Sequence, residues 1–426
     1  MTSQLWLHDL CAKASASDTS IDTDTLVHEQ VLPPSEDPWY RPPEGWQVKG
    51  PGDILRIRSA KKLSEILKDC AAAYHILYRS TDSRNEPSWA ITTLCIPSYV
   101  YRSTLGKVAI LSYQFAYNSA NLDSSPSFAL TGVMARSEPN LGIKSSTSLI
   151  NEMLSFGWIV NVPDHLGPTS AFGASVQAGH ATLDAVRAVH CLLDLRESLN
   201  HSTAVWGYSG GSIATFAAAE LQTRYAPEVE IAGAVLGGLV DDISGVFDKL
   251  NKSPIAATLI AFLLGITSQY PEARKYLESR LWPDTKDEFM SVLDSEVTQA
   301  VKHFSGRDIY SFFQDGVADL RSPQLRGLYD DQVKLGSRGV AKMPMFVYKA
   351  IDDQFCPIEW TDATVDKLCN AGAEITYERN TVGSHVSEIE NGKPRAFQFL
   401  WGIFDGSYVS PATKRKVSDV TVDVSA

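Results

Sequence analysis

Cysteine is scarce in this chain, and its spacing excludes two kinds of site. Six cysteines occur in 426 residues, and none of them forms a Cys-x-x-Cys pair or stands at the Cys/His spacing of zinc ligands. Zinc sites and the disulfide frameworks of small secreted domains both need clustered cysteines. We therefore expect neither a metal nor a disulfide scaffold, and we expect the thiols to be mostly free and buried. They are Cys11, Cys70, Cys95, Cys191, Cys356 and Cys369.

Long apolar runs are also missing. The longest, Ile255 to Ile266, is shorter than the roughly 20 apolar residues that cross a bilayer, so we expect no integral membrane segment. The N-terminal stretch MTSQLWLHDLCAKASASDTS lacks the basic start and the sustained apolar core of a secretory signal. The expected location is therefore cytoplasmic, or extracellular if a signal has been removed.

Positive charge is too sparse for a nucleic-acid surface. The chain has 38 Lys and Arg against 50 Asp and Glu, a net charge of -12. Phosphate binding needs a concentration of basic side chains, and the short run Lys414-Arg415-Lys416 lies in a polar tail. The hydrophobic share of 44% is that of a globular chain with a buried core. We expect a small-molecule partner, and the oligomeric state stays open.

Short β-rich runs alternate with helical patterns along most of the chain. The later runs are nearly continuous apolar stretches, as in parallel strands that are covered on both faces. This order predicts an α/β fold with a mostly parallel, doubly wound sheet. The expected strands are 74–78, 89–96, 107–113, 158–162, 204–206, 231–236, 345–349 and 374–379, and the expected helices are 148–155, 176–199, 210–224 and 361–370.

Between residues 241 and 335 the alternation stops and helical segments follow one another. An insertion at this point is expected to cover the carboxyl ends of the strands, where open α/β sheets bind ligands. Its apolar stretch at 255–266 either binds an acyl chain or fills the core of the insertion itself. The expected organisation is a peripheral segment 1–35, an α/β core at 36–240 and 336–408, a helical cap at 241–335, and a polar tail 409–426.

One serine has the local sequence of a nucleophile elbow. Gly207-Tyr208-Ser209-Gly210-Gly211 fits the pattern GxSxG, with an apolar strand before it and a helical, alanine-rich stretch after it. Gly207 and Gly211 are expected to be structural, because small residues at these positions let the strand and the helix approach closely. Ser209 is therefore the candidate nucleophile; the alternative is a serine in an ordinary glycine-rich turn.

A serine nucleophile needs a base, and the base needs an acid that orients it. In this fold the three follow in the order Ser, acid, His. His303 and His385 follow the serine; His303 falls inside the cap, and we favour His385 because its loop comes after the last expected strand. Asp352 and Asp353 both follow the preceding strand, and position alone does not separate them.

The developing oxyanion also needs backbone donors. We expect one at Gly210 and the other at Asn118, in the loop QFAYNSANLD after the strand VAILSY; the alternative for Asn118 is an ordinary polar loop. His165 is expected to be structural rather than pocket-lining. Asp241 and Asp242 are expected to cap the first helix of the insertion.

Several segments together resemble the fungal secretory lipase (LIP) family, a branch of the α/β-hydrolases. The segments are DPWYRPPEGWQVKGPGDILRIRS, YHILYRSTD, NVPDHLGPTSAF, AVWGYSGGSIATFAAAELQTRYAPE, and DDQFCPIEWTDATVDKLCNAGAEITY followed by GSHVSEI. The likeness runs from about Asp37 to Gly406 and implies a cofactor-free serine hydrolase that acts on carboxylic esters. It also selects Asp353, because the family's acid lies four residues before the proline of a DExVP-like motif.

The chain departs from this family at three places. Family members usually carry a signal peptide, a cysteine where this chain has Ser124-Ser125-Pro126-Ser127, and an aspartate where it has Asn118. A disulfide of the secreted members is therefore expected to be missing, and Asn118 is tolerable if its backbone amide is the donor. These departures favour an intracellular esterase for a secondary metabolite over an exported fat-digesting lipase.

The expected reaction is ester hydrolysis through an acyl-enzyme. Ser209 attacks the carbonyl, His385 takes the proton, and Asp353 steadies the imidazolium. One alternative keeps these residues but uses an alcohol as acceptor, which makes the enzyme an acyltransferase or a lactone-forming enzyme. The other is a binding protein on a hydrolase scaffold, which the intact order of Ser, Asp and His disfavours. The acyl and alcohol specificity cannot be predicted from the sequence.

Overall fold

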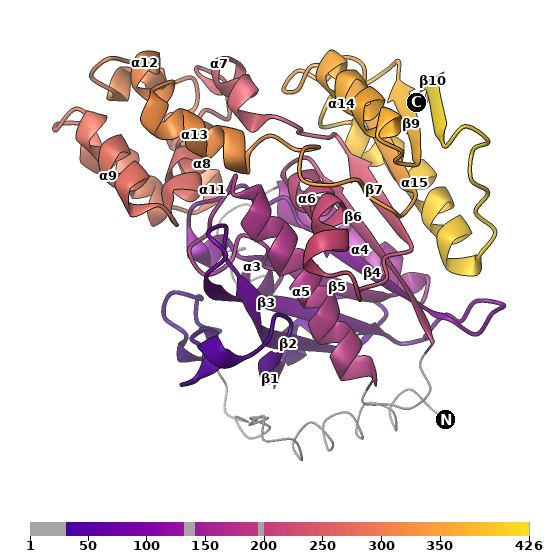
Figure 1. Ribbon diagram of the computed structural model, residues 1–426. Helices are drawn as coiled ribbons and strands as arrows, with labels where there is room; N and C mark the ends of the chain where they lie inside the picture. Colours follow the sequence, from indigo (N-terminus) through magenta and orange to yellow (C-terminus); the bar gives the residue numbers. More distant parts are fainter. Residues whose placement is uncertain (1–30, 132–140, 195–199, 426) are drawn as a thin grey trace.

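The computed structural model describes residues 31–131, 141–194 and 200–425, and in this part of the chain a ten-stranded sheet forms the centre of the molecule (Figure 1). Its strands are β1 Ile54–Ser59, β2 Cys70–Thr81, β3 Pro87–Pro97, β4 Val108–Gln114, β5 Ile159–Pro163, β6 His201–Tyr208, β7 Gly233–Gly237, β8 Met345–Ala350, β9 Ile375–Asn380 and β10 Arg415–Val420. Their spatial order is β1-β2-β3-β5-β4-β6-β7-β8-β9-β10. The pairings from β1 to β5 are antiparallel, and those from β5 to β10 are parallel. The expected mostly parallel sheet is confirmed.

Helices cover both faces of the sheet. They are α4 Leu141–Ser155, α5 Ser175–Asp194, α6 Gly210–Tyr225, α14 Ile358–Asn370 and α15 Glu388–Asp405. Successive residues of β6 show the two sides: Trp206 packs edge-on against Phe397 of α15, whereas Gly207 lies against Thr215 of α6. Because both faces are covered, every residue of β4, β5, β7 and β8 is buried.

The edges of the sheet differ from the expectation. The eight expected strands are present, but β1 and β10 were missed. Residues 409–426, expected to form a tail, contain β10, which pairs with β9 from Arg415 opposite Ile375 to Val420 opposite Asn380. This strand was missed because its side chains are mostly exposed and polar, so only backbone pairing marks it. Residues 1–30 of the expected peripheral segment and 195–199 of an expected helix lie outside the described residues.

The stretch from residue 241 to 335 connects the end of β7 to the start of β8 and is largely helical (Figure 1). Its helices are α7 Phe247–Leu250, α8 Ala257–Thr267, α9 Pro271–Arg280, α10 Lys286–Met290, α11 Val297–Phe304, α12 Val317–Leu320 and α13 Pro323–Gln332. A Cβ atom at Gly265 would lie 2.5 Å from the backbone nitrogen of Phe172, and one at Gly173 would lie 2.4 Å from the ring of Phe262. The apolar helix α8 therefore packs directly on the core.

Four of the cysteines that the structure describes, Cys70, Cys95, Cys356 and Cys369, are free thiols. Cys95 and Cys356 are buried, Cys70 and Cys369 are half-buried, and Cys191 is exposed, so the expectation of mostly buried thiols is wrong. Cys11 lies outside the described residues. Within the described ranges, no helix is long and apolar enough to span a membrane.

Candidate active site

Ser209 stands between β6 and α6 in a strained backbone conformation. Its φ of 52° and ψ of -123° are rare for a residue with a side chain. The backbone nitrogen of Ser209 donates to Gly237 of β7 at 3.0 Å, and its carbonyl oxygen accepts from the hydroxyl of Ser212 at 2.6 Å. These two hydrogen bonds stabilise the turn that exposes the serine hydroxyl at the end of the strand.

Two glycines of the elbow have no room for a side chain. A Cβ atom at Gly207 would lie 2.1 Å from the carbonyl oxygen of Gly211, and a Cβ atom at Gly211 would lie 1.9 Å from the carbonyl oxygen of Gln114. Both contacts are with backbone atoms, which cannot move aside without shifting β4, β6 or α6. The close approach of strand and helix therefore accounts for glycine at both positions.

The structure brings Ser209, His385 and Asp353 together in one hydrogen-bonded chain. Nε2 of His385 lies 2.8 Å from Oγ of Ser209, and Nδ1 lies 2.7 Å from Oδ2 of Asp353. Asp353 and His385 are both buried. Asp352, the alternative acid, is exposed. The geometry is that of a nucleophile, a base and an orienting acid, and it separates the two aspartates that position alone did not.

Asp353 is held in its ionised form. Its Oδ1 accepts the backbone amides of Phe355 and Cys356 at 2.9 and 3.0 Å. Burial raises the pKa of Asp353, but the hydrogen bond and charge of His385, followed by the charge of Lys349, lower it to about 2. The carboxylate is thus available to stabilise a positive charge on the imidazole.

The backbone of His385 is fixed on both sides. Its amide donates to Oε1 of Gln354 at 3.0 Å, and its carbonyl oxygen accepts from the hydroxyl of Tyr208 at 2.6 Å. The ring of Phe355 packs edge-on against the imidazole at 5.2 Å. Tyr208, Gln354 and Phe355 were not singled out from the sequence, although each is a chain neighbour of Ser209 or Asp353.

Asn118, the expected second donor to the oxyanion, lies against the elbow. A Cβ atom at Gly210 would lie 1.8 Å from Oδ1 of Asn118, so the two residues are in close contact. Asn118 has a positive φ of 36°, and its buried Oδ1 has no hydrogen-bond partner among the described residues. The structure therefore brings both expected oxyanion residues to the end of β6.

The other histidine and acid candidates lie elsewhere. His303 of α11 is exposed, and its Nε2 lies 2.9 Å from Oε1 of Glu288 in the cap. His165 is buried against the ring of Tyr117, and burial lowers its pKa to about 3. Within the described residues, no group of three or more His, Cys, Asp and Glu side chains is arranged to hold a metal ion.

Asp241 does not cap a helix. Its carboxyl group is buried, and Oδ2 accepts from the hydroxyl of Thr364 at 2.5 Å. Asp242 instead accepts the backbone amide of Gly245 at the start of the following turn, at 3.3 Å. The expectation that both acids act as caps is therefore wrong for Asp241, because its side chain points inward, toward α14.

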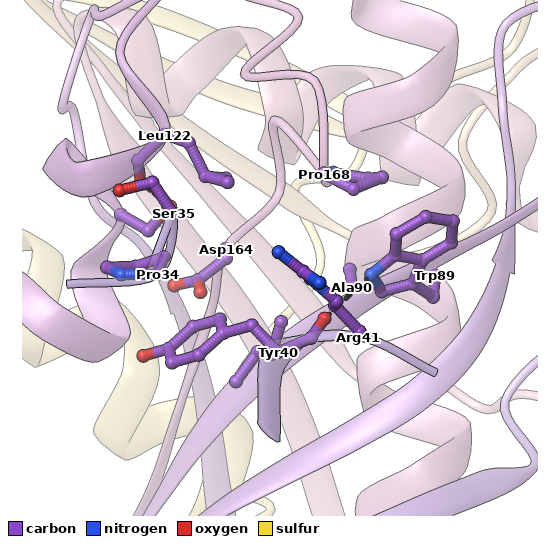
Figure 2. A pocket seen from close by; sticks show the side chains of 12 residues that line it. Pro34, Ser35, Tyr40, Arg41, Trp89, Ala90, Leu122, Asp164 and Pro168 are labelled. Atoms are coloured by element: carbon purple, nitrogen blue, oxygen red, sulfur yellow. Dashed lines mark hydrogen bonds between the residues drawn. The ribbon is translucent and has the colours of Figure 1, made fainter. Parts of the chain in front are cut away.

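The structure also contains a pocket of about 190 Å³ (Figure 2). Tyr40, Arg41, Trp89 and Asp164 are among its lining residues, whereas Ser209, Asp353 and His385 are not. Burial raises the pKa of Asp164 to about 7, although its carboxylate accepts two hydrogen bonds from Ser127. His165, the neighbour of Asp164, does not line the pocket.

Comparisons with known proteins identify a family and relatives along most of the chain. The model of the family described as "Secretory lipase" matches residues 136–411. The chain is 54% identical over 420 residues to "Probable trichothecene esterase SAT6" of Stachybotrys chartarum, which covers 98% of this chain and 87% of the relative. It is 38% identical over 430 residues to the trichothecene C-3 esterase of Fusarium sporotrichioides, which covers 98% of this chain and 92% of the relative.

A solved structure shows the same fold. Candida antarctica lipase A superposes with a TM-score of 0.81 at 24% identity, over 93% of this chain and 91% of that one. The expected α/β-hydrolase fold is thereby confirmed.

Proposed function

Since this chain belongs to the secretory lipase family and is a carboxylic ester hydrolase, we propose that Ser209, His385 and Asp353 are its catalytic triad. The observation that carries the proposal is the continuous chain of hydrogen bonds from Oγ of Ser209 through both imidazole nitrogens to Oδ2 of Asp353. A serine hydroxyl becomes an effective nucleophile when an oriented imidazole accepts its proton.

The reaction starts when Oγ of Ser209 attacks the ester carbonyl and its proton passes to Nε2 of His385. The imidazolium keeps its Nδ1–H on Asp353, and the backbone amides of Gly210 and Asn118 donate to the oxyanion. His385 then protonates the leaving alcohol, and an acyl-enzyme forms. In the second half, His385 takes a proton from water, which attacks the acyl carbonyl and releases the carboxylic acid.

The proposed substrate is an ester of a trichothecene-type secondary metabolite. Two relatives named as trichothecene esterases, at 54% and 38% identity, each align with 98% of this chain. The proposed acceptor is water, because both relatives are named as esterases. The cytoplasmic location expected from residues 1–20 stays a prediction, and those residues lie outside the described part of the chain.

Labelling with a fluorophosphonate probe tests the triad. The wild type should be labelled, and Ser209→Ala and His385→Ala should lose labelling together with about 10⁴-fold or more of the hydrolysis of p-nitrophenyl acetate. His303→Ala is the matched control, because His303 also bonds a carboxylate but lies exposed in the cap, and it should keep full activity. A labelled and active Ser209→Ala protein contradicts the proposal.

Product analysis tests the substrate and the acceptor. An acetylated trichothecene should be converted to its free alcohol and acetate in a reaction that Ser209→Ala abolishes. Hydrolysis of p-nitrophenyl acetate without any attack on the trichothecene ester rejects the proposed substrate class. Formation of a new ester when alcohols are added, at the expense of free acid, rejects water as the principal acceptor.

A further inference from the structure

Lys349 of β8 is fully buried, and its ammonium group lies beside the acid of the site. None of its side chain is exposed (0%). Nζ donates to the carbonyl oxygen of Leu239 at 2.8 Å and to Oγ1 of Thr361 at 3.2 Å, and it lies 3.6 Å from Oδ2 of Asp353. A lysine is rarely buried without a partner, because removing an ammonium group from water costs several kcal/mol. The buried ammonium group thus lies among three oxygen atoms, one of which belongs to the acid of the candidate site.

One oxygen of Asp353 faces both Lys349 and His385. Oδ2 accepts from Nδ1 of His385 and is the oxygen nearest to Nζ of Lys349, whereas Oδ1 is occupied by two backbone amides. The ammonium therefore stabilises the carboxylate in its ionised form. It also opposes a second positive charge on the imidazole, because the two cationic sites share one buried counter-ion.

A series of hydrogen bonds connects Lys349 with the elbow. Lys349 holds the carbonyl group of Leu239, and the next residue, Val240, donates its backbone amide to Oγ of Ser212 at 3.3 Å. The hydroxyl of Ser212 in turn donates to the backbone carbonyl of Ser209. The loop after β7 thus joins the buried ammonium to the backbone of the nucleophile, and the side chains of the triad close the ring.

We propose that Lys349 is a positioning residue of this hydrolase, which holds Asp353 and the Ser209 elbow in one ring of hydrogen bonds closed by an ion pair and places its positive charge beside the carboxylate that His385 also contacts. The inference rests on the proposed function, because it concerns the same three side chains. It goes beyond that function, since Lys349 touches neither the serine hydroxyl nor the imidazole in any hydrogen bond described above.

Other ionisable groups surround this cluster. Asp241, in the loop after β7, carries a buried Oδ1 without a hydrogen-bond partner among the described residues, and the charge of Lys349 acts on it as well. The ammonium therefore offsets two buried carboxylates, Asp241 and Asp353. Tyr208 of β6 and Cys356 of the loop after β8 interact electrostatically with Asp353, while Lys249 of α7 acts on Cys356 and Glu388 of α15 acts on Tyr208.

Lys349→Met removes the charge and keeps most of the volume. The variant is tested by measuring kcat/KM for p-nitrophenyl acetate from about pH 4 to about pH 9. The acidic limb of this pH profile should move to higher pH by roughly half to one pH unit, because the imidazole then accepts a proton more readily. At the optimum, kcat should fall about tenfold while KM changes by less than about twofold. The pH dependence of fluorophosphonate inactivation should shift by the same amount, which ties the effect to the nucleophile rather than to substrate binding.

Two companion variants separate charge from packing. Thr361→Val removes one acceptor of the ammonium but leaves its charge, so the acidic limb should stay where it is in the wild type. Lys349→Gln is a second neutral variant and should shift the limb in the same direction as Lys349→Met. Thermal unfolding and circular dichroism show whether each variant is folded.

Four outcomes overturn the inference. If Lys349→Met is folded and its pH profile has the same acidic limb as the wild type, Lys349 has no electrostatic role. If KM rises while kcat is unchanged, Lys349 acts on substrate binding instead. An equal shift in Thr361→Val makes the effect one of packing. Failure of both neutral variants to fold assigns Lys349 to stability alone. The Ser209→Ala variant distinguishes failure of the proposed function from failure of the inference about Lys349. If Ser209→Ala stays active, the proposed function fails. If it is inactive while Lys349→Met behaves as the wild type, only the inference about Lys349 fails.

Discussion

The hydrogen bond from Tyr208 to the backbone of His385 provides a direct test of how the base is held. The hydroxyl of Tyr208 donates to the carbonyl oxygen of His385 at 2.6 Å, and the tyrosine is buried. Burial raises the pKa of the phenol well above its ordinary value, so the hydroxyl remains a donor throughout the working pH range. Tyr208→Phe removes this donor and leaves the aromatic ring in place.

We expect Tyr208→Phe to lower the free energy of unfolding by about 1 to 3 kcal/mol, the usual cost of leaving a buried polar group without its partner. The same bond fixes the loop that carries the imidazole. If the poorer positioning of the base raises the activation free energy by about 1.4 kcal/mol, kcat should fall about tenfold. KM should change little, because the substitution acts on the base and not on ground-state binding.

The assay is steady-state hydrolysis of p-nitrophenyl acetate, with urea unfolding of the same preparations. Tyr78→Phe is the matched control: Tyr78 is also fully buried, and its hydroxyl donates to the carbonyl oxygen of Ala181 at 2.8 Å, in a separate core cluster. This control should lose comparable stability and keep the wild-type kcat. The reasoning is refuted if Tyr208→Phe retains full kcat, or if Tyr78→Phe loses as much of it.

Three further changes test other parts of the molecule. Gly211→Ala should give little soluble protein, because its Cβ atom would lie 1.9 Å from the carbonyl oxygen of Gln114; expression and thermal unfolding measure this. Asn118→Asp should keep kcat/KM within about tenfold if the backbone amide is the oxyanion donor, whereas a loss of 10²-fold or more points to the side chain. Burial raises the pKa of Asp164 to about 7 in the folded protein, whereas in the unfolded chain it is about 4. The contribution of Asp164 to the free energy of unfolding is therefore full below about pH 4 and is lost as the pH rises through 7. The free energy of unfolding, measured with urea, should therefore decline less between those two pH values in Asp164→Asn than in the wild type.

Much of the fold could be predicted from local patterns. Each of the eight central strands was expected, because apolar runs bounded by turn residues are visible without knowledge of any contact. The edge strands β1 and β10 were missed, since a strand paired on one side needs no continuous apolar run. The last turns of the expected helix at 176–199 lie outside the described residues and stay a prediction.

Some residues of the candidate site could also be predicted from the sequence, and others could not. Ser209 and its glycines were predictable because the requirements of a sharp turn are met by adjacent residues. The choice between Asp352 and Asp353 was not, since both follow the same strand; the structure exposes one and buries the other against His385. Lys349 left only an indirect trace in the sequence, a single charge inside the apolar strand MFVYKA.

The sequence by itself determined the order of strands and helices, the position of the elbow, and a short set of candidate bases and acids, because periodicity and turn chemistry depend on residues close together in the chain. Only the tertiary structure decided which side chains meet. Tyr208 reaches the backbone of His385, and Lys349 reaches both Leu239 and Asp353, because the parallel strands that carry or precede these residues end side by side at one edge of the sheet. The strength of these contacts depends on burial and distance, and neither quantity is encoded by sequence spacing.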